Sequence, residues 1–66
     1  MRLKVNGDTI EVAKGASVGE LLEKLGVEPA RVAVEVNLLI VKKSEYGNIR
    51  LNDGDTVEIV NFVGGG

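Results

Sequence analysis

Three consecutive glycines, Gly64–Gly66, end the sequence and are its most distinctive chemical feature. Glycine adds no side chain to a core and resists ordering, so we expect residues 64–66 to form a flexible tail. Fully extended, the segment from Val63 to Gly66 spans roughly 13 Å. Such a tail is thin enough to enter a narrow channel of another protein and deliver a terminal carboxylate there. The alternative at this point is a frayed terminus without a function.

Cysteine and histidine are both absent from the 66 residues. The chain therefore has no thiol nucleophile and no imidazole that titrates near neutral pH. Disulfides and Cys/His zinc sites are excluded for the same reason. Side-chain catalysis would rest on Asp, Glu, Lys or the single Tyr46, which is a poor set of groups. We therefore predict that the chain is not an enzyme, has no catalytic residue of its own and binds no metal or cofactor, which leaves the triple glycine as the plausible seat of its chemistry.

The charge pattern gives little support to a nucleic-acid or membrane partner. The net charge is −2, the only adjacent basic pair is Lys42-Lys43, and the aromatic residues are Tyr46 and Phe62. A nucleic-acid surface normally has a basic stripe, with stacking aromatics where it binds single strands. The N-terminus lacks the apolar run of a signal peptide, and no stretch approaches the ~20 apolar residues of a membrane span. We expect a cytoplasmic protein.

The first half of the sequence predicts a hairpin followed by a helix. Asn6-Gly7 is a strong tight-turn signal between alternating apolar residues, so we expect a hairpin over residues 2–13. Ser17 and Glu20 form a capping box, after which an apolar stripe at helical spacing predicts a helix over residues 18–25. Lys24 stands four residues after Glu20, so the two side chains can pair on the outer side of the helix. Gly26 has the place of a left-handed C-terminal cap.

The second half predicts three more strands. Alternating valines indicate a strand over residues 32–36, Asn37 is a turn candidate, and residues 39–41 read as a short strand. Residues 42–50 are polar, with a possible helical turn at residues 44–46, and a tight turn at residues 52–55 leads to a last strand over residues 56–63. The order strand, strand, helix, strand, strand, strand predicts an α+β fold, in which one helix packs on a mixed sheet of four to five strands. We expect one domain, residues 1–63, followed by the tail at residues 64–66.

The last strand also offers a candidate docking surface. Strand alternation places Val57 and Ile59 on one face and Val60 and Phe62 on the other, away from the core. An exposed aromatic residue beside a flexible terminus suits partner binding, so we predict docking through Val60, Phe62 and Val63. The alternative for Phe62 is that it folds over the sheet edge and completes the packing.

The whole chain resembles the ThiS-like sulfur carriers of thiamine biosynthesis, within the ubiquitin-like β-grasp superfamily. The resemblance covers nearly the full length and keeps its order. The matching residues are Leu3–Gly7, Ser17-Val18, Glu20–Leu22, Val32–Asn37, Ser44–Tyr46, Leu51, Asp53–Asp55, Val57–Val60 and Val63–Gly66. Three positions depart from the family pattern: Leu38-Leu39 follows Asn37, Lys42 stands where proline is common, and Phe62 is larger than expected before the tail.

The resemblance implies a β-grasp fold and a carrier chemistry. An E1-like adenylyltransferase (ThiF-like) would use ATP and magnesium to adenylate Gly66, with Gly64 and Gly65 as the stalk that enters its active site. Sulfur from a cysteine-desulfurase relay would then displace AMP and leave a C-terminal thiocarboxylate. The implied acceptor is a thiazole synthase (ThiG-like), which takes the sulfur into the thiazole of thiamine.

Two further groups of functions stay open on the sequence. One is a sulfur carrier for molybdopterin synthesis or tRNA thiolation, which uses the same terminal chemistry with another acceptor. The other is a ubiquitin-like modifier that is joined to lysines through Gly66, or a β-grasp interaction module with an inert tail.

Overall fold

The last strand of the sequence lies at the centre of the sheet. The computed structural model describes residues 1–62, and its five strands form one sheet in the order β2-β1-β5-β3-β4. The strands are β1 (Arg2–Val5), β2 (Asp8–Glu11), β3 (Val32–Val36), β4 (Leu39–Val41) and β5 (Thr56–Asn61). The helices of the described chain are α1 (Val18–Lys24) and two short 3₁₀ helices, η1 (Pro29–Arg31) and η2 (Lys43–Glu45).

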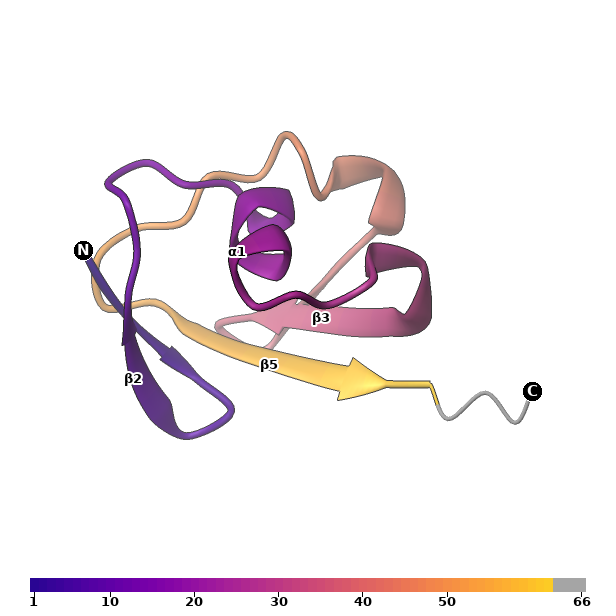
Figure 1. The fold of residues 1–66 in the computed structure, drawn as a ribbon, viewed down its shortest axis with the longest axis horizontal. Coiled ribbons are helices and arrows are strands. Elements are labelled where there is room, and N and C mark those ends of the chain that lie inside the picture. Colours follow the sequence, from indigo (N-terminus) through magenta and orange to yellow (C-terminus); the bar gives the residue numbers. More distant parts are fainter. Residues whose placement is uncertain (63–66) are drawn as a thin grey trace.

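The sheet is mixed, and one helix covers one of its faces (Figure 1). Strand β5 runs parallel to β1 and antiparallel to β3, while the pairs β1–β2 and β3–β4 are antiparallel hairpins. This is the α+β arrangement that the order of predicted elements required, with all five strands in one sheet. The fold is a β-grasp, as expected.

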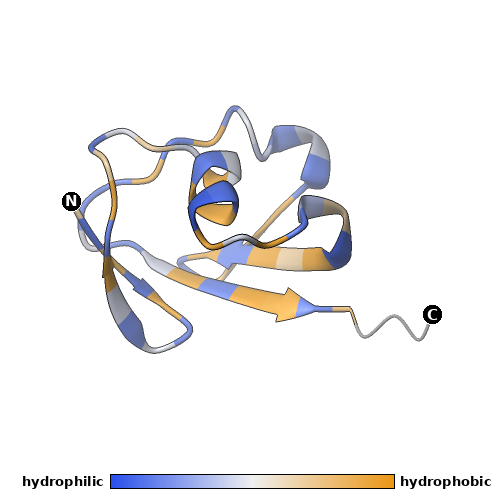
Figure 2. Ribbon diagram, in the orientation of Figure 1, coloured by the Kyte–Doolittle hydropathy of each residue, from blue (hydrophilic) through white to orange (hydrophobic). Residues whose placement is uncertain are grey.

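The core lies between α1 and the sheet. Val18, Leu21 and Leu22 on one side of α1 are at most 1% exposed, and Leu25 of the predicted stripe is partly buried. The sheet contributes the inward residues of its three central strands, which are Leu3, Val5, Val32, Val34 and Val57. Figure 2 shows hydrophobic stretches along β3, β5 and α1. Regular packing of short aliphatic side chains thus provides the core of a domain that has no disulfide.

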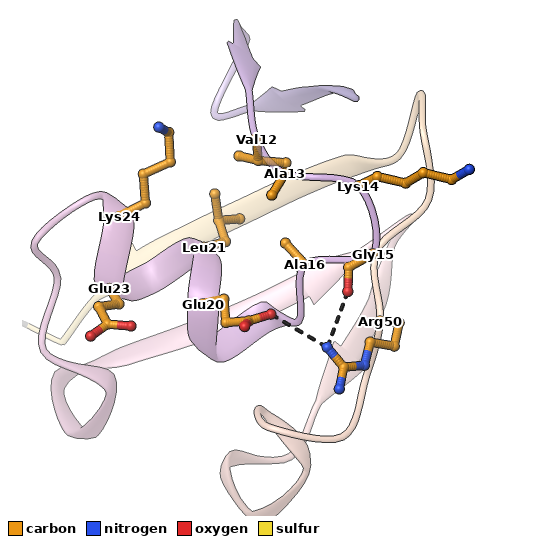
Figure 3. A pocket seen from close by; sticks show the side chains of 10 residues that line it. All are labelled: Val12, Ala13, Lys14, Gly15, Ala16, Glu20, Leu21, Glu23, Lys24 and Arg50. Carbon is orange, nitrogen blue, oxygen red and sulfur yellow. Dashed lines mark hydrogen bonds and ion pairs between the residues drawn. The ribbon is translucent and has the colours of Figure 1, made fainter.

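The predicted capping box starts α1. The Glu20 N–H donates to Ser17 Oγ (3.1 Å), and the Ser17 N–H donates back to Glu20 Oε1 (2.8 Å). That backbone hydrogen bond from Ser17 is the main reason why the pKa of the Glu20 carboxyl lies below its ordinary value. The predicted pair between Glu20 and Lys24 is wrong: the cap turns the carboxylate away from Lys24 and toward Arg50 Nη1, 3.4 Å away (Figure 3). Gly26 ends the helix at φ +69°, as expected.

The last strand is shorter than predicted, and two other segments differ in detail. Strand β5 ends at Asn61, which is paired with Val32 at the start of β3. Beyond this pair the Phe62 N–H donates to the Arg31 carbonyl of η1, which continues the β3–β5 pairing by one hydrogen bond past the end of the strand. The helical turn expected at residues 44–46 forms one residue earlier as η2, and η1 was not predicted. Val63 lies outside the described residues.

Two asparagines at left-handed turn positions hold β5 from either side. Asn6 follows β1, and its side chain accepts from the Ile59 N–H (2.7 Å) and donates to the Ile59 carbonyl (3.1 Å). It therefore acts as a strand partner at a point where β1 has already ended. Asn37 accepts from the Thr56 N–H at the other end of β5 (3.0 Å), and its own N–H donates to the Thr56 carbonyl (2.7 Å).

The two hairpins share one turn geometry but differ in its second residue. Asn6-Gly7 has φ values of 48° and 88°, and Asn37-Leu38 has 51° and 72°. Two positive φ angles define the type I′ turn, which favours Asn-Gly because a Cβ at the second position is strained. Leu38 holds this position while 83% exposed, so no burial offsets the strain.

Replacing Leu38 with glycine should therefore stabilise the fold. Leu38→Gly gives the second turn the residues of the first, and we expect a gain of about 0.5–1 kcal/mol, since relief of the left-handed strain exceeds the backbone entropy cost of glycine. For a domain of this size the melting temperature should rise by roughly 2–8 °C. Leu38→Ala is the matched control, because it removes the apolar side chain but keeps the Cβ. A Leu38→Gly protein no more stable than Leu38→Ala would contradict the assignment of strain.

Removing the Asn6 side chain should weaken the middle of β5. Asn6→Gly keeps the backbone conformation of the turn but deletes both hydrogen bonds to Ile59, so we expect a loss of about 1 kcal/mol in urea unfolding. Asn6→Asp keeps the acceptor for the Ile59 N–H and loses the donor, so its loss should be smaller. Amide hydrogen exchange at Ile59 should accelerate in Asn6→Gly. Unchanged exchange there would show that the side chain does not hold the strand.

Candidate functional site

The far end of β5 is the part of the described chain that leads toward the C-terminal glycines. On one side β5 pairs with β3 up to Asn61. On the other side β1 pairs only with Thr56 and Val57, and Asn6 supports the strand one step further at Ile59. The last residues of β5 therefore extend past the first hairpin toward one end of the molecule (Figure 1).

A single backbone carbonyl organises this end of the sheet. The Val32 carbonyl accepts from Lys43 Nζ (2.8 Å) and from Tyr46 Oη (3.0 Å), both of which come from the segment after β4. Tyr46 is buried, and this burial raises the pKa of its phenol. The hydroxyl therefore remains a neutral hydrogen-bond donor at physiological pH. Lys43 and Tyr46 fix the start of β3, which in turn pairs with the end of β5.

Lys43 also contacts Phe62 directly. Its Nζ lies 4.7 Å from the centroid of the Phe62 ring, within the range of a cation–π interaction. The Phe62 backbone is held at the same time, because its N–H donates to the Arg31 carbonyl (2.8 Å). Lys43 belongs to the only adjacent basic pair of the sequence, and its side chain links η2 to β3 and Phe62.

Val60 and Phe62 are exposed, as strand alternation predicted. Val60 is 59% exposed and Phe62 is 53% exposed, while Val57 of the same strand is fully buried and Ile59 is partly buried. Glu58 is also exposed, and the residue opposite Val60 in β3 is the small Ala33. Phe62 does not complete the core: half of its surface stays open. The other predicted site residues, Val63 and Gly64–Gly66, lie outside the described residues.

The acidic groups beside α1 and in the turn at residues 52–55 are held by structural hydrogen bonds. No three His, Cys, Asp or Glu side chains of residues 1–62 lie together as metal ligands. The hollow beside α1 has charged walls (Figure 3), but Arg50 donates to the Gly15 carbonyl and pairs with Glu20, whose carboxylate also serves the helix cap. In the turn at residues 52–55, Asp55 accepts from the Asn52 N–H and from Asn37. These acidic groups have structural partners.

Sequence reasoning missed the residues that support the end of β5. Lys43, Tyr46 and Asn6 act through contacts that are 11, 14 and 53 residues apart in the sequence. Tyr46 carried one usable signal, since a lone aromatic residue in a polar segment of a small domain is a candidate for burial. Lys43 carried none. Over residues 1–62 the structure also contains no helix long and apolar enough to cross a membrane.

Comparisons with known proteins agree with this architecture. The model of the ThiS family matches residues 3–66. The thiazole synthase of Paramagnetospirillum magneticum is 48% identical over 66 residues, which are 100% of this chain but 20% of that protein, so the chain spans a fifth of its length. The sulfur carrier protein ThiS of Bacillus subtilis is 38% identical over 65 residues, 97% of this chain and 98% of the relative.

A solved structure extends the agreement to the fold. The crystal structure of the thiamine biosynthesis protein ThiS from Geobacter metallireducens has a TM-score of 0.86 to this chain at 38% identity, and the match covers 100% of both chains. The family match over almost the whole sequence, the end-to-end similarity to carriers of the same length and the shared β-grasp fold lead to one conclusion: this chain belongs to the ThiS family.

Proposed function

We propose that this chain is a sulfur carrier of thiamine biosynthesis and no enzyme itself, and that Gly66 carries the sulfur as a C-terminal thiocarboxylate. The observation that carries the proposal is the end-to-end similarity to the sulfur carrier protein ThiS of Bacillus subtilis. The family match also runs through residue 66, so it includes all three glycines. The absence of cysteine from the sequence supports the same position, because no side chain could hold a persulfide.

The proposed chemistry takes place on the terminal carboxylate and in a partner enzyme. A carboxylate is a poor electrophile, so an E1-like adenylyltransferase activates it: a Gly66 oxygen attacks the α-phosphorus of ATP, pyrophosphate leaves, and an acyl adenylate forms. Magnesium and ATP belong to that enzyme. The outer sulfur of a persulfide in a cysteine-desulfurase relay then attacks the carbonyl carbon, and AMP leaves with the former carboxylate oxygen. A thiol reduces the acyl disulfide so formed, which releases the thiocarboxylate and leaves the relay cysteine in a disulfide with that thiol. The resulting thiocarboxylate is a good sulfur nucleophile.

The proposed docking surface consists of Val60, Phe62 and Val63. Val60 and Phe62 are half exposed, while the strand and segment beneath them are fixed by Asn6, Lys43 and the Val32 carbonyl. A partner that contacts these side chains would receive residues 64–66 in a defined direction, because β5 is held on both sides. Aromatic side chains are common anchors of protein interfaces, which favours Phe62 as the central contact.

We propose a thiazole synthase as the acceptor of the sulfur. The support comes from the Paramagnetospirillum magneticum relative, which is named thiazole synthase although a segment like this chain makes up only 20% of it. The polypeptide that is named thiazole synthase thus includes a segment similar to this chain. Such an arrangement raises the effective concentration of a carrier near its acceptor.

Intact-mass spectrometry tests the modification. Protein incubated with ATP, magnesium, the E1-like enzyme of the source organism and a sulfide donor should gain about 16 Da, as one terminal oxygen is replaced by sulfur. Fragmentation should place the gain on Gly66. Omitting the sulfide donor should leave the adenylate or its hydrolysis product.

A truncation serves as the matched control. Removing Gly65 and Gly66 should abolish the mass gain and leave the melting temperature nearly unchanged, since glycine adds no side chain to a core and Val57 is the last buried residue among residues 1–62. If the full chain is never modified by the activating enzymes of its own organism, the carrier proposal fails. If Gly66 is found in an isopeptide bond to lysine, the modifier function replaces it. Transfer of the sulfur to another acceptor would refute only the thiazole step.

Phe62→Ala tests the docking surface separately. We expect its affinity for the activating enzyme to fall by about fivefold or more, as for the loss of an aromatic anchor worth over 1 kcal/mol. Leu39→Ala is the control, because Leu39 is 73% exposed on β4, away from the end of β5. Unchanged affinity together with a clear loss of stability would make Phe62 a packing residue and exclude it from docking.

A further inference from the structure

The two edges of the sheet differ in chemistry. The β2 edge carries charge at both of its ends, Asp8 and Glu11. Strand β4 contains no charged residue and directly follows Leu38. The exposed fractions of Leu38, Leu39 and Ile40 are 83%, 73% and 76%. Natural sheets normally blunt an open edge with short strands, charges, proline or bulges, because an apolar edge pairs with other strands. The β2 edge carries charges, whereas β4 is short, with three residues, and has apolar side chains throughout.

We infer that β4 is a self-association surface, at which two copies of this chain pair their β4 strands antiparallel about a two-fold axis at Ile40. This inference goes beyond the carrier function and does not depend on it. The occupant is a second copy because the strand is complementary to itself in hydrogen bonding, in side-chain pattern and in charge.

Hydrogen bonding is centred on Ile40. Val36 and Leu39 flank the two-residue turn and face each other, so Leu39 and Val41 direct their backbone groups toward β3. The Asn37 N–H donates to Thr56 of β5, which fixes the alternation in β3. The N–H and carbonyl of Ile40 therefore point to the open edge. In the two-fold arrangement, Ile40 of each copy exchanges both hydrogen bonds with Ile40 of the other.

The side chains match in the same register. Ile40 pairs with Glu35 of β3 and so lies on the outer face, where the two Ile40 side chains would meet. Leu39 lies on the same face as Val41, which pairs with the buried Val34. Leu39 of one copy would face Val41 of the other, above a hollow that Ile49 also lines. Apolar side chains of each copy thus cover those of the other.

Charge does not oppose the pairing. Lys42 is the charged residue that follows β4 in the sequence, and in this register it faces Leu38 of the other copy, where its aliphatic stem can cover the leucine. The two Lys42 residues lie four positions apart along the strands, which is roughly 13 Å. That separation exceeds the screening length of about 8 Å at physiological salt. Because β3 lies between β4 and β5, the pairing leaves Val60 uncovered.

The size of the surface sets the expected strength. Stable interfaces bury about 1,200–2,000 Å² in total, so the lower limit needs about 600 Å² from each copy. That is roughly a seventh of the 4392 Å² that the chain exposes. A three-residue strand with Leu38 and Ile49 beside it reaches this limit at best. We therefore expect a weak dimer with a dissociation constant of hundreds of micromolar, which forms at high concentration.

Sedimentation equilibrium from about 20 µM to about 2 mM tests the inference. The apparent mass of the full chain should rise with concentration from 7.0 kDa toward twice that value. Ile40→Lys places a charge at the two-fold axis and should keep the chain monomeric throughout. Thr9→Lys adds the same charge to the exposed β2 edge and should associate as the unaltered chain does. Circular dichroism should show that both variants are folded, because both positions are exposed.

Concentration-dependent amide shifts in the unaltered chain locate the surface without any variant. They should concentrate on residues 38–42, with the Ile40 amide shifted most. A chain that stays monomeric to the highest concentration overturns the inference. So does association that persists in Ile40→Lys, or shifts that concentrate on β5 around Val60 instead of β4.

Discussion

The pairing of β5 on both of its sides is the constraint on which the rest of the structure depends. Strands β1 and β3 contact β5 directly, and β2 and β4 reach it through them. The parallel partner β1 covers only two residues of β5, so the strand would have one open side over most of its length. The side chain of Asn6 closes part of that gap by occupying both backbone groups of Ile59. The long antiparallel pairing with β3 holds the other side.

Different parts of the chain therefore serve the stability of the domain and its proposed function. Buried residues occur along the chain as far as Val57, and from Glu58 onward the described residues are exposed or only partly buried. The last part of β5 is therefore positioned mainly by hydrogen bonds, while its outward side chains stay available. Lys43 and Tyr46 contribute by fixing the Val32 carbonyl, which keeps β3 in register at the point where β5 ends.

The elements that depend on residues close together in the sequence could be predicted from the sequence alone. The Asn6-Gly7 turn, the capping box of Ser17 and Glu20, and the alternating valines of β3 each involve residues a few positions apart, and each predicted its element. The exposed position of Val60 followed from alternation for the same reason. Alternation could not decide the surroundings of Phe62, because the strand ends at Asn61 and the contact with Lys43 is not local. The Glu20–Lys24 pair failed because the helix cap and the distant Arg50 compete for the same carboxylate.

The turns of the two hairpins have the same backbone conformation but expose different side chains. Asn6 and Asn37 have nearly the same φ, and both reach across to β5, so the turns have the same structural task. The residues that follow the two asparagines make no such contact. Gly7 adopts its positive φ without strain, whereas Leu38 is strained at a positive φ and exposes an apolar side chain. Strain at an exposed residue has no explanation in packing, and such strain is common where a residue contacts a partner. The apolar residues of β4 lie directly beside it, so the strained turn and the open edge form one surface.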